Sequence, residues 1–114
     1  MTAAEESRRE VAKQTLPGDP GRELTLIEVK YPVGTGSPPH VHTNGVMAFV
    51  VSGSIESKVG DEAARTYEAG ESWWEPPGAI HHISRNADDS SPATLLAIYI
   101  APTGASPEEL MRPV

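Results

Sequence analysis

Cysteine is absent from the 114-residue chain, and its absence excludes several kinds of chemistry at once. There can be no disulfide bond, no thiolate metal ligand and no cysteine nucleophile. Long hydrophobic runs are also absent: no stretch of about eighteen apolar residues occurs, and the charged segment from Glu5 to Glu10 has no apolar run behind it. We therefore expect neither a membrane span nor a signal peptide. Any metal ion must be held by nitrogen or oxygen ligands.

Basic residues are few. Nine lysines and arginines stand against sixteen aspartates and glutamates, which gives a formal net charge of −7. Apart from the pair Arg8 and Arg9 the basic residues are scattered singly, whereas a nucleic-acid surface needs clustered cations that replace the counterions on phosphate. The composition argues against a nucleic-acid partner and predicts a cytoplasmic protein.

The length is that of one domain with one hydrophobic core. Residues 1–10 are polar and are expected to form a flexible N-terminal arm, either a short helix or a disordered segment. Residues 102–114, which contain three prolines and a glycine, are expected to form a C-terminal tail. The structured domain is thus predicted to span residues 11–101.

Short β-rich runs alternate with turn signals along this domain. The runs are Glu23 to Tyr31, Val46 to Val51, Ser54 to Val59, Arg65 to Tyr67, Ser72 to Glu75, Ile80 to Ser84 and Thr94 to Ala101, with Val11 to Leu16 as a weaker extra strand. In the first run Leu24 and Leu26 share one face and Thr25 and Ile27 the other, a period of two that indicates strands. With eleven prolines and ten glycines, the pattern predicts an all-β antiparallel sandwich, jelly roll or barrel.

The four histidines fall in two places, His40 and His42 in one segment and His81 and His82 in the other. Residues i and i+2 of a strand face the same side, so His40 and His42 present imidazoles roughly 7 Å apart at the backbone, close enough to converge on one ion at ~2.1 Å. A third ligand must come from the other segment, and we favour His81 over His82. The alternative is that the pair is a chance occurrence on an exposed strand edge.

Glycines, prolines and histidines together form two patterns along the chain. The first consists of Gly34, His40, His42 and Gly53, with the segment FVVSGS closing it. The second consists of Gly70, Pro76, Gly78, His81 and Asn86, with one extra residue before the asparagine. Both patterns resemble the two sequence motifs of the cupin family, and the resemblance covers roughly residues 23–101.

This resemblance implies a double-stranded β-helix (jelly-roll) barrel that holds one divalent metal ion on His40, His42 and His81. The metal-binding glutamate of the family's first motif falls here on Val46 or Met47, neither of which carries a carboxylate. We expect Met47 to form part of the pocket wall, since borderline divalent ions prefer nitrogen and oxygen to a thioether. The expected site is therefore three neutral imidazoles with open positions that attract an anionic oxygen.

Glu75 is the best substitute for the missing carboxylate. It could be a distant ligand, an acceptor for an imidazole N–H, or a catalytic base, and the alternative is a solvent-facing carboxylate on a strand. If Glu75 points into the barrel, alternation places Trp73 beside it and sends Trp74 to the outer face, where it could pack in a dimer interface. His82, offset by one from His81, is expected at the surface or behind the ligands.

Cupins differ widely in activity, so the fold does not decide the reaction. We expect a metal-dependent, dioxygenase-like enzyme that acts on a small anionic compound, aromatic or polyketide-like. A non-catalytic binding or sensory barrel and a non-redox isomerase or cyclase are the alternatives. Iron, manganese, zinc, nickel and copper all suit imidazole ligands. Because small barrels have open sheet edges, and the two terminal segments could cover those edges in a partner, we also expect a homodimer.

Overall fold

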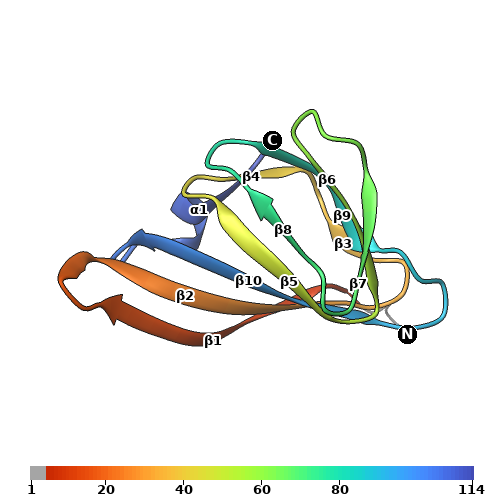
Figure 1. Ribbon diagram of the computed structural model, residues 1–114, viewed down its shortest axis with the longest axis horizontal. Helices are drawn as coiled ribbons and strands as arrows, with labels where there is room; N and C mark the ends of the chain where they lie inside the picture. The colour runs from red at the N-terminus through yellow and green to blue at the C-terminus, as the bar shows by residue number, and fades with distance from the viewer. Residues whose placement is uncertain (1–4) are drawn as a thin grey trace.

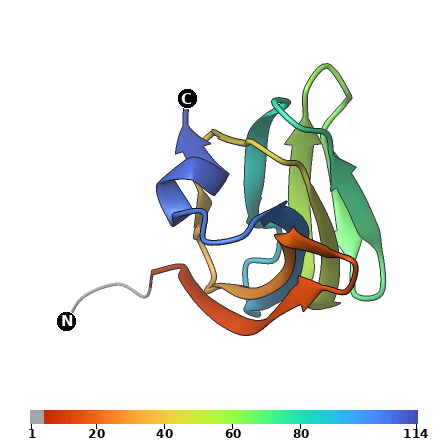
Figure 2. The same ribbon diagram turned by 90° about the vertical axis from the view of Figure 1, so that its left-hand side faces the viewer.

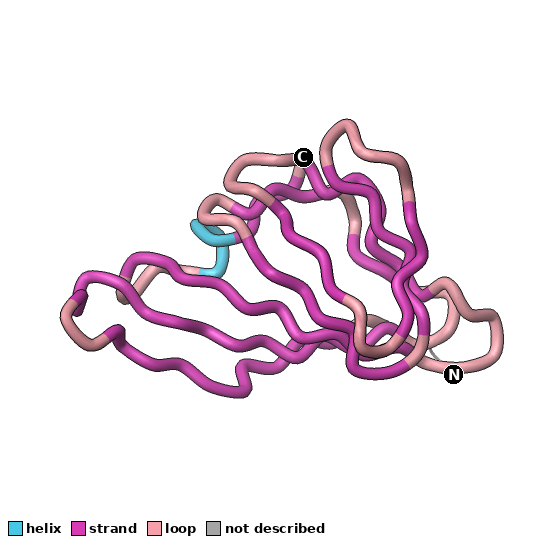
Figure 3. The backbone as a smooth tube through the Cα atoms, in the orientation of Figure 1, coloured by secondary structure: helices cyan, strands magenta, loops and turns pink. Residues whose placement is uncertain are grey.

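The computed structural model describes residues 5–114, which form β-strands and one short helix (Figure 3). One sheet contains, in spatial order, β1 (Ser7–Leu16), β2 (Asp19–Tyr31), β10 (Ala93–Pro102), β5 (Val46–Ser52) and β8 (Ser72–Glu75). The other contains β11 (Met111–Pro113), β4 (His40–His42), β9 (Ile80–Asn86), β6 (Ser54–Val59) and β7 (Arg65–Glu68), with β3 (Gly36–Ser37) paired to β9. The helix is α1 (Pro107–Leu110).

The two sheets face each other and enclose the core, while β1, β2 and β10 extend beyond the barrel at one end (Figures 1 and 2). Every strand pair among the described residues is antiparallel. The all-β jelly-roll barrel expected from the sequence is confirmed.

Alternation along each strand decides which side chains enter the core. In β5 the side chains of Val46, Ala48 and Val50 are buried, whereas those of Met47, Phe49 and Val51 are exposed on the outer face of the sheet. The buried set continues through Val29 and Tyr31 of β2, Ile55 of β6 and Leu95 of β10. Removing these apolar side chains from water is the main favourable contribution to folding.

Strand β1 begins earlier than the sequence predicts. Residues 7–10, which were expected within a flexible arm, form the first part of β1 and pair with β2. Every side chain of β1 except that of Leu16 is exposed, so no hydrophobic alternation marks these residues as a strand. Backbone hydrogen bonds to β2, rather than burial, define this element. Residues 1–4 of the expected arm lie outside the described residues.

The C-terminal residues 102–114, expected to form a tail, contain helix α1 and a further strand. After α1, strand β11 pairs with β4, so that Met111 lies opposite His42 and Pro113 opposite His40. Proline is tolerated there because β11 is the outermost strand of its sheet. The C-terminal residues therefore cover the edge of the strand that carries two histidines. None of the helical structure in residues 5–114 is long and apolar enough to cross a membrane.

Candidate metal centre

Two imidazoles meet because β4 and β9 are neighbours in the sheet. Their register places His40 directly opposite His81, and both residues are buried. The ring centroids are 5.0 Å apart, and His40 Nε2 lies 3.3 Å from His81 Nδ1. Two nitrogen atoms from different strands thus face one small space inside the barrel.

His42 joins them from the same side of β4 as His40. Its ring centroid lies 4.8 Å from that of His40, and its Nε2 atom lies 3.7 Å from Glu75 Oε1. Burial lowers the pKa of His42 to about 4, and the Glu75 carboxylate only partly opposes this effect. The imidazole is therefore neutral at pH 7, which is the form that binds metal ions.

Glu75 enters the same space from the other sheet, on the strand paired with β5. It lies directly opposite Val46, one of the two positions where the first motif lacks its carboxylate. Glu75 is 3% exposed, and its Oε2 atom accepts a hydrogen bond of 2.9 Å from Trp73 Nε1. Its Oε1 atom is buried 3.1 Å from His81 Nδ1, but the two atoms are not aligned as a hydrogen bond, and no residue in the described range donates one to Oε1. Val46 cannot supply a carboxylate oxygen, and Glu75 places one beside the imidazoles instead.

Hydrogen bonds behind the rings of His40 and His81 orient these two imidazoles. His40 Nδ1 donates to the carbonyl oxygen of Pro38 at 2.8 Å, so the lone pair of His40 Nε2 points into the space. His81 Nε2 lies 2.7 Å from the buried Ser57 hydroxyl, and donation to that oxygen leaves the lone pair on Nδ1. Such outer partners orient metal-binding imidazoles. No sequence pattern pointed to Ser57, because a single serine on a strand matches no motif.

The charges of these groups suit a cation. Burial lowers the pKa of His40, so this imidazole is neutral at pH 7 as well. Burial alone would raise the pKa of Glu75, but the neighbouring His81 and His42 rings and the Trp73 N–H outweigh it, and the net pKa is lowered. At pH 7 the site therefore combines an ionised carboxylate with the neutral imidazoles of His40 and His42.

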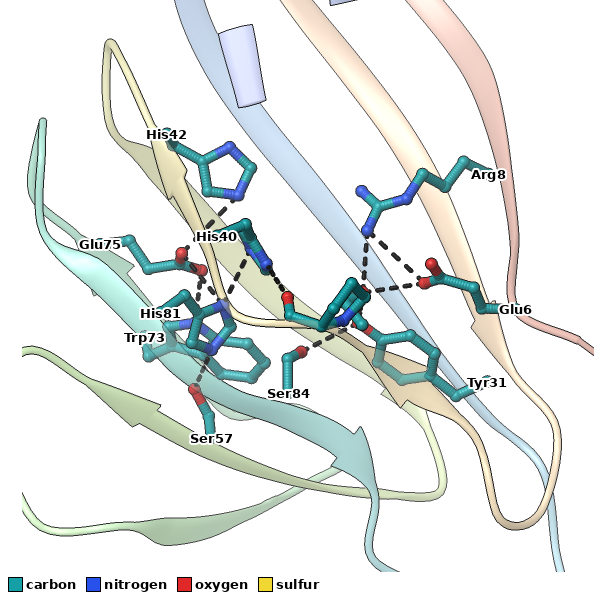
Figure 4. Close-up of polar contacts among 12 residues, drawn as sticks. Glu6, Arg8, Tyr31, His40, His42, Ser57, Trp73, Glu75, His81 and Ser84 are labelled. Carbon is teal, nitrogen blue, oxygen red and sulfur yellow. Dashed lines mark hydrogen bonds and ion pairs between the residues drawn. The ribbon is translucent and has the colours of Figure 1, made fainter. Parts of the chain in front are cut away.

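The spacing of the inward-facing atoms fits one ion. Ligands held ~2.1 Å from a shared ion are roughly 3 to 3.5 Å apart when they occupy neighbouring positions. His40, Glu75 and His81 each offer an atom within 4.8 Å of the others, and the separations of 3.1 and 3.3 Å around His81 Nδ1 match that range. Figure 4 shows these three side chains converging, with His42 above them. The residues present therefore fit a divalent ion.

A second set of polar groups links the wall of this space to strand β1. The buried Tyr31 hydroxyl lies 2.9 Å from Ser84 Oγ and 2.6 Å from Ser37 Oγ. Ser37 in turn donates to Glu6 and accepts from Arg8 Nη2, both at 2.8 Å (Figure 4). Burial raises the pKa of Tyr31, so its hydroxyl stays protonated at neutral pH.

A wider cavity of about 320 Å³ opens above His42. Its apolar walls include Ile27, Tyr99, Leu110 and Met111. Arg8, His42 and Ala97 line both this cavity and the inner space that contains Glu75, so the two adjoin each other. The volume is at the lower end of the range for small-molecule sites, and a small ligand could reach the histidines from this side.

The remaining residues singled out in the sequence do not supply ligand atoms to the inner space. Trp73 is buried beside Glu75 and Trp74 is 50% exposed, as alternation requires once Glu75 points inward. His82 is exposed. Met47 is 41% exposed on the outer face, so the expectation that it forms part of the pocket wall is wrong. Val46 occupies the inward position of that strand instead.

The model of the cupin domain matches residues 27–99, well over half of the chain. The chain belongs to the cupin family. The matched region contains the histidines and Glu75 but excludes strand β1 and the C-terminal segment of this cupin. No curated protein matches the chain significantly.

Solved structures share the fold. A conserved Klebsiella pneumoniae protein with a double-stranded β-helix domain is 21% identical, with 93% of this chain and 84% of that one covered and a TM-score of 0.70. The DMSP lyase DddQ from Ruegeria pomeroyi is 20% identical (TM-score 0.70), with 89% of this chain and 49% of that one covered. An oxalate oxidase in complex with glycolate is 19% identical (TM-score 0.67), with coverage of 86% and 55%. This cupin therefore spans about half the length of each of these two enzymes.

Proposed function

We propose that this cupin holds one divalent metal ion on His40, His42 and His81, with Glu75 as a fourth ligand, and acts on a small anionic compound. The observation that carries the proposal is the buried Oε1 atom of Glu75, which has no hydrogen-bond partner in residues 5–114 and faces the imidazole nitrogens. A buried carboxylate oxygen without a hydrogen-bond partner is costly, and a bound cation would remove that cost.

The ligand set agrees with the absence of cysteine. Imidazole and carboxylate donors suit iron, manganese, zinc, nickel and copper, and cellular supply often decides among them. A bound divalent ion would act as a Lewis acid toward an anionic oxygen of the substrate. The protein would hold the ion, orient the imidazoles through Pro38 and Ser57, and keep water from the inner side with Val46 and Trp73.

The anionic character of the substrate follows from charge. A divalent ion with one carboxylate ligand leaves a net positive centre in a buried space, and such a centre favours an anionic oxygen. The apolar walls above His42 suit a substrate with a hydrocarbon portion, which is compatible with an aromatic or polyketide-like compound. The small volume of the cavity favours a compact molecule.

The type of reaction needs its own test. The dioxygenase-like expectation depended on a site with three histidines and no carboxylate, and Glu75 weakens that reason. The Tyr31 hydroxyl lies in the wall of the inner space, but it donates its proton to Ser37, which itself donates to Glu6, so it favours neither redox nor non-redox chemistry. We retain the oxygen-dependent enzyme as the leading hypothesis, with a non-redox reaction and a non-catalytic sensor as the outcomes that would replace it.

The proposal is tested first by elemental analysis of the purified protein. Wild type should contain about one ion per chain, and His40→Ala, His42→Ala and His81→Ala should each lose most of it. His82→Ala is the matched control, since His82 adjoins His81 but is exposed, and it should retain the metal. Full metal content in His81→Ala with loss in His82→Ala would refute the site.

Turnover is tested next with the iron- or manganese-loaded protein. Candidate small carboxylates and phenolates are incubated with and without oxygen, and oxygen consumption and products are measured. Consumption of oxygen with product formation supports the oxygenase, product formation without oxygen indicates a non-redox enzyme, and binding without turnover indicates a sensor.

We further propose that two copies of this cupin associate through the outer face of the five-stranded sheet. Apolar side chains point outward from four neighbouring strands of that sheet: Leu24, Leu26, Met47, Phe49, Val51, Trp74, Leu96, Ile98 and Ile100. The register aligns Leu26, Ile98, Met47 and Trp74 in one row across the strands. A contiguous apolar surface of this kind marks an association site.

The charges on this face are compatible with a second copy as the partner. The chain carries a net charge of −7, so two copies repel each other at acidic faces. On the outward face of β2 the carboxylate is Glu28, which is matched by Arg9 at 3.5 Å and Lys30 at 3.9 Å. The apolar face is therefore a surface on which like-charged chains can meet, and it replaces the sheet edges as the expected contact.

A further inference from the structure

Strand β1 brings a cation to the metal centre. The register pairs Arg8 with the buried residue Val29, so the Arg8 side chain lies on the inner face of the sheet, whereas Arg9 pairs with Glu28 on the outer face. Figure 4 shows the Arg8 guanidinium extending from β1 toward the side where His40 and His42 lie. Among the described residues that line the inner space, Arg8 is the one basic residue other than the histidines.

Arg8 is held in place but is not fully used. Its Nη2 atom donates to Ser37 Oγ at 2.8 Å and lies 3.5 Å from Glu6 Oε2. Ser37 is fixed in turn by Tyr31 and Glu6. Across residues 5–114, no group accepts a hydrogen bond from Nε or Nη1 of Arg8. A positioned guanidinium with free N–H groups matches the geometry of a carboxylate.

The other cation on the inner face of β1 is already paired. Lys13 lines the outer cavity, but its amino group lies 3.2 Å from Glu10 and 3.6 Å from Glu23, and these carboxylates raise the pKa of Lys13. Arg8 lines both the outer cavity and the inner space, whereas Arg9 and Lys13 line the outer cavity but not the inner space. Arg8 is therefore the cation placed to contact a ligand that reaches the histidines.

We propose that Arg8 binds a carboxylate of the substrate in the cavity mouth, so that the site selects a small molecule with an oxygen donor at one end and a carboxylate at the other. This inference rests on the proposed function, because the oxygen donor would occupy the metal centre. It extends that function by naming a specificity residue outside the region matched by the cupin model. The selected class is that of small dicarboxylates and hydroxy- or oxo-acids.

The test compares ligands that differ by one charge. The protein loaded with Co²⁺, whose visible absorption responds to ligands, is titrated with malonate, succinate and glutarate and with the monomethyl ester of each. The ester keeps one carboxylate for the metal centre and a similar length but removes the second charge. For at least one length, wild type should bind the diacid about tenfold or more tightly than its monoester, as expected for a charged hydrogen-bonded pair.

Variants then assign that preference to a residue. Arg8→Gln should remove the preference while leaving the affinity for the monoester and the Co²⁺ content unchanged. Arg8→Lys, which keeps the charge but lacks the guanidinium fork, should retain part of it. Arg22→Gln is the matched control, since Arg22 pairs with Asp19 at 2.6 Å and lines neither the outer cavity nor the inner space, and it should behave as wild type.

The possible failures are distinct. If wild type does not bind Co²⁺ at the histidines, the proposed function is refuted and the role of Arg8 falls with it. If Co²⁺ binds but wild type shows no preference for any diacid, or Arg8→Gln keeps the preference, the metal site stands and the inference about Arg8 is wrong. Loss of the preference in Lys13→Gln alone would assign the contact to Lys13 and overturn it as well.

Discussion

The buried neutral state of His42 should make the metal-free protein sensitive to mild acid. Burial lowers the pKa of His42 from 6.5 to about 4, so between these values the unfolded chain binds a proton that the folded protein excludes. The free energy of unfolding must therefore fall as the pH falls through this window. The stabilisation is fully present above about pH 7.

The size of the effect follows from the two pKa values. A shift of one pKa unit corresponds to about 1.4 kcal/mol, so the shift in His42 amounts to about 3 kcal/mol once the pH reaches 4, and about 2 kcal/mol is already lost at pH 5. A domain of this size has a total stability of about 5 to 15 kcal/mol. His40 contributes in the same direction, because burial lowers its pKa too.

The measurement is urea unfolding of chelator-treated protein at several pH values between 4 and 8. Wild type should lose stability steadily below about pH 6.5, and His42→Gln should lose distinctly less, with the remaining slope due to His40. His82→Gln is the control, since that side chain is exposed, and it should follow wild type. The lowered pKa of Glu75 changes the free energy of unfolding only below about pH 4.5, so it does not contribute to the loss of stability above that pH. If His42→Gln has the same pH dependence as wild type, protonation of His42 does not cause the loss of stability.

Three further predictions concern the ligand, the association face and the backbone. If Glu75 is a metal ligand, Glu75→Gln should weaken metal binding by about 10- to 100-fold. If Glu75 is instead a catalytic base, the variant should keep its metal and lose about 10²-fold in turnover. Chelator competition measures the first effect and rate assays the second. Phe49→Glu should convert dimer to monomer in light scattering at tens of micromolar, whereas Val33→Glu, an exposed valine outside that face, should not; a monomeric wild type would refute the proposal. Gly45→Ala should lower the free energy of unfolding by more than Gly104→Ala does. Both glycines have φ near 80°, but a Cβ at Gly45 would lie 2.9 Å from the Glu75 carbonyl oxygen. Equal losses of stability in urea unfolding would contradict this.

The strands and the two motifs were predictable because they depend on local pattern. Alternation of apolar and polar side chains identifies β2, β5 and β10, since each has one face in the core. The same criterion missed residues 7–10 of β1 and the short strand β11, whose side chains are mostly exposed. Such strands are stabilised by backbone pairing with a neighbour, and the sequence carries no signal of which neighbour that is.

In the candidate site, the donor types, the two histidine segments and the lack of a carboxylate in the first motif can all be read from the amino-acid sequence. The sequence also linked the directions of Glu75, Trp73 and Trp74 through alternation. The position of Glu75 opposite Val46, and the reach of Arg8 from β1 into the same space, depend on how the strands pair. Alternation is fixed within a strand, whereas the partner of each strand and its register are set by packing across the whole barrel.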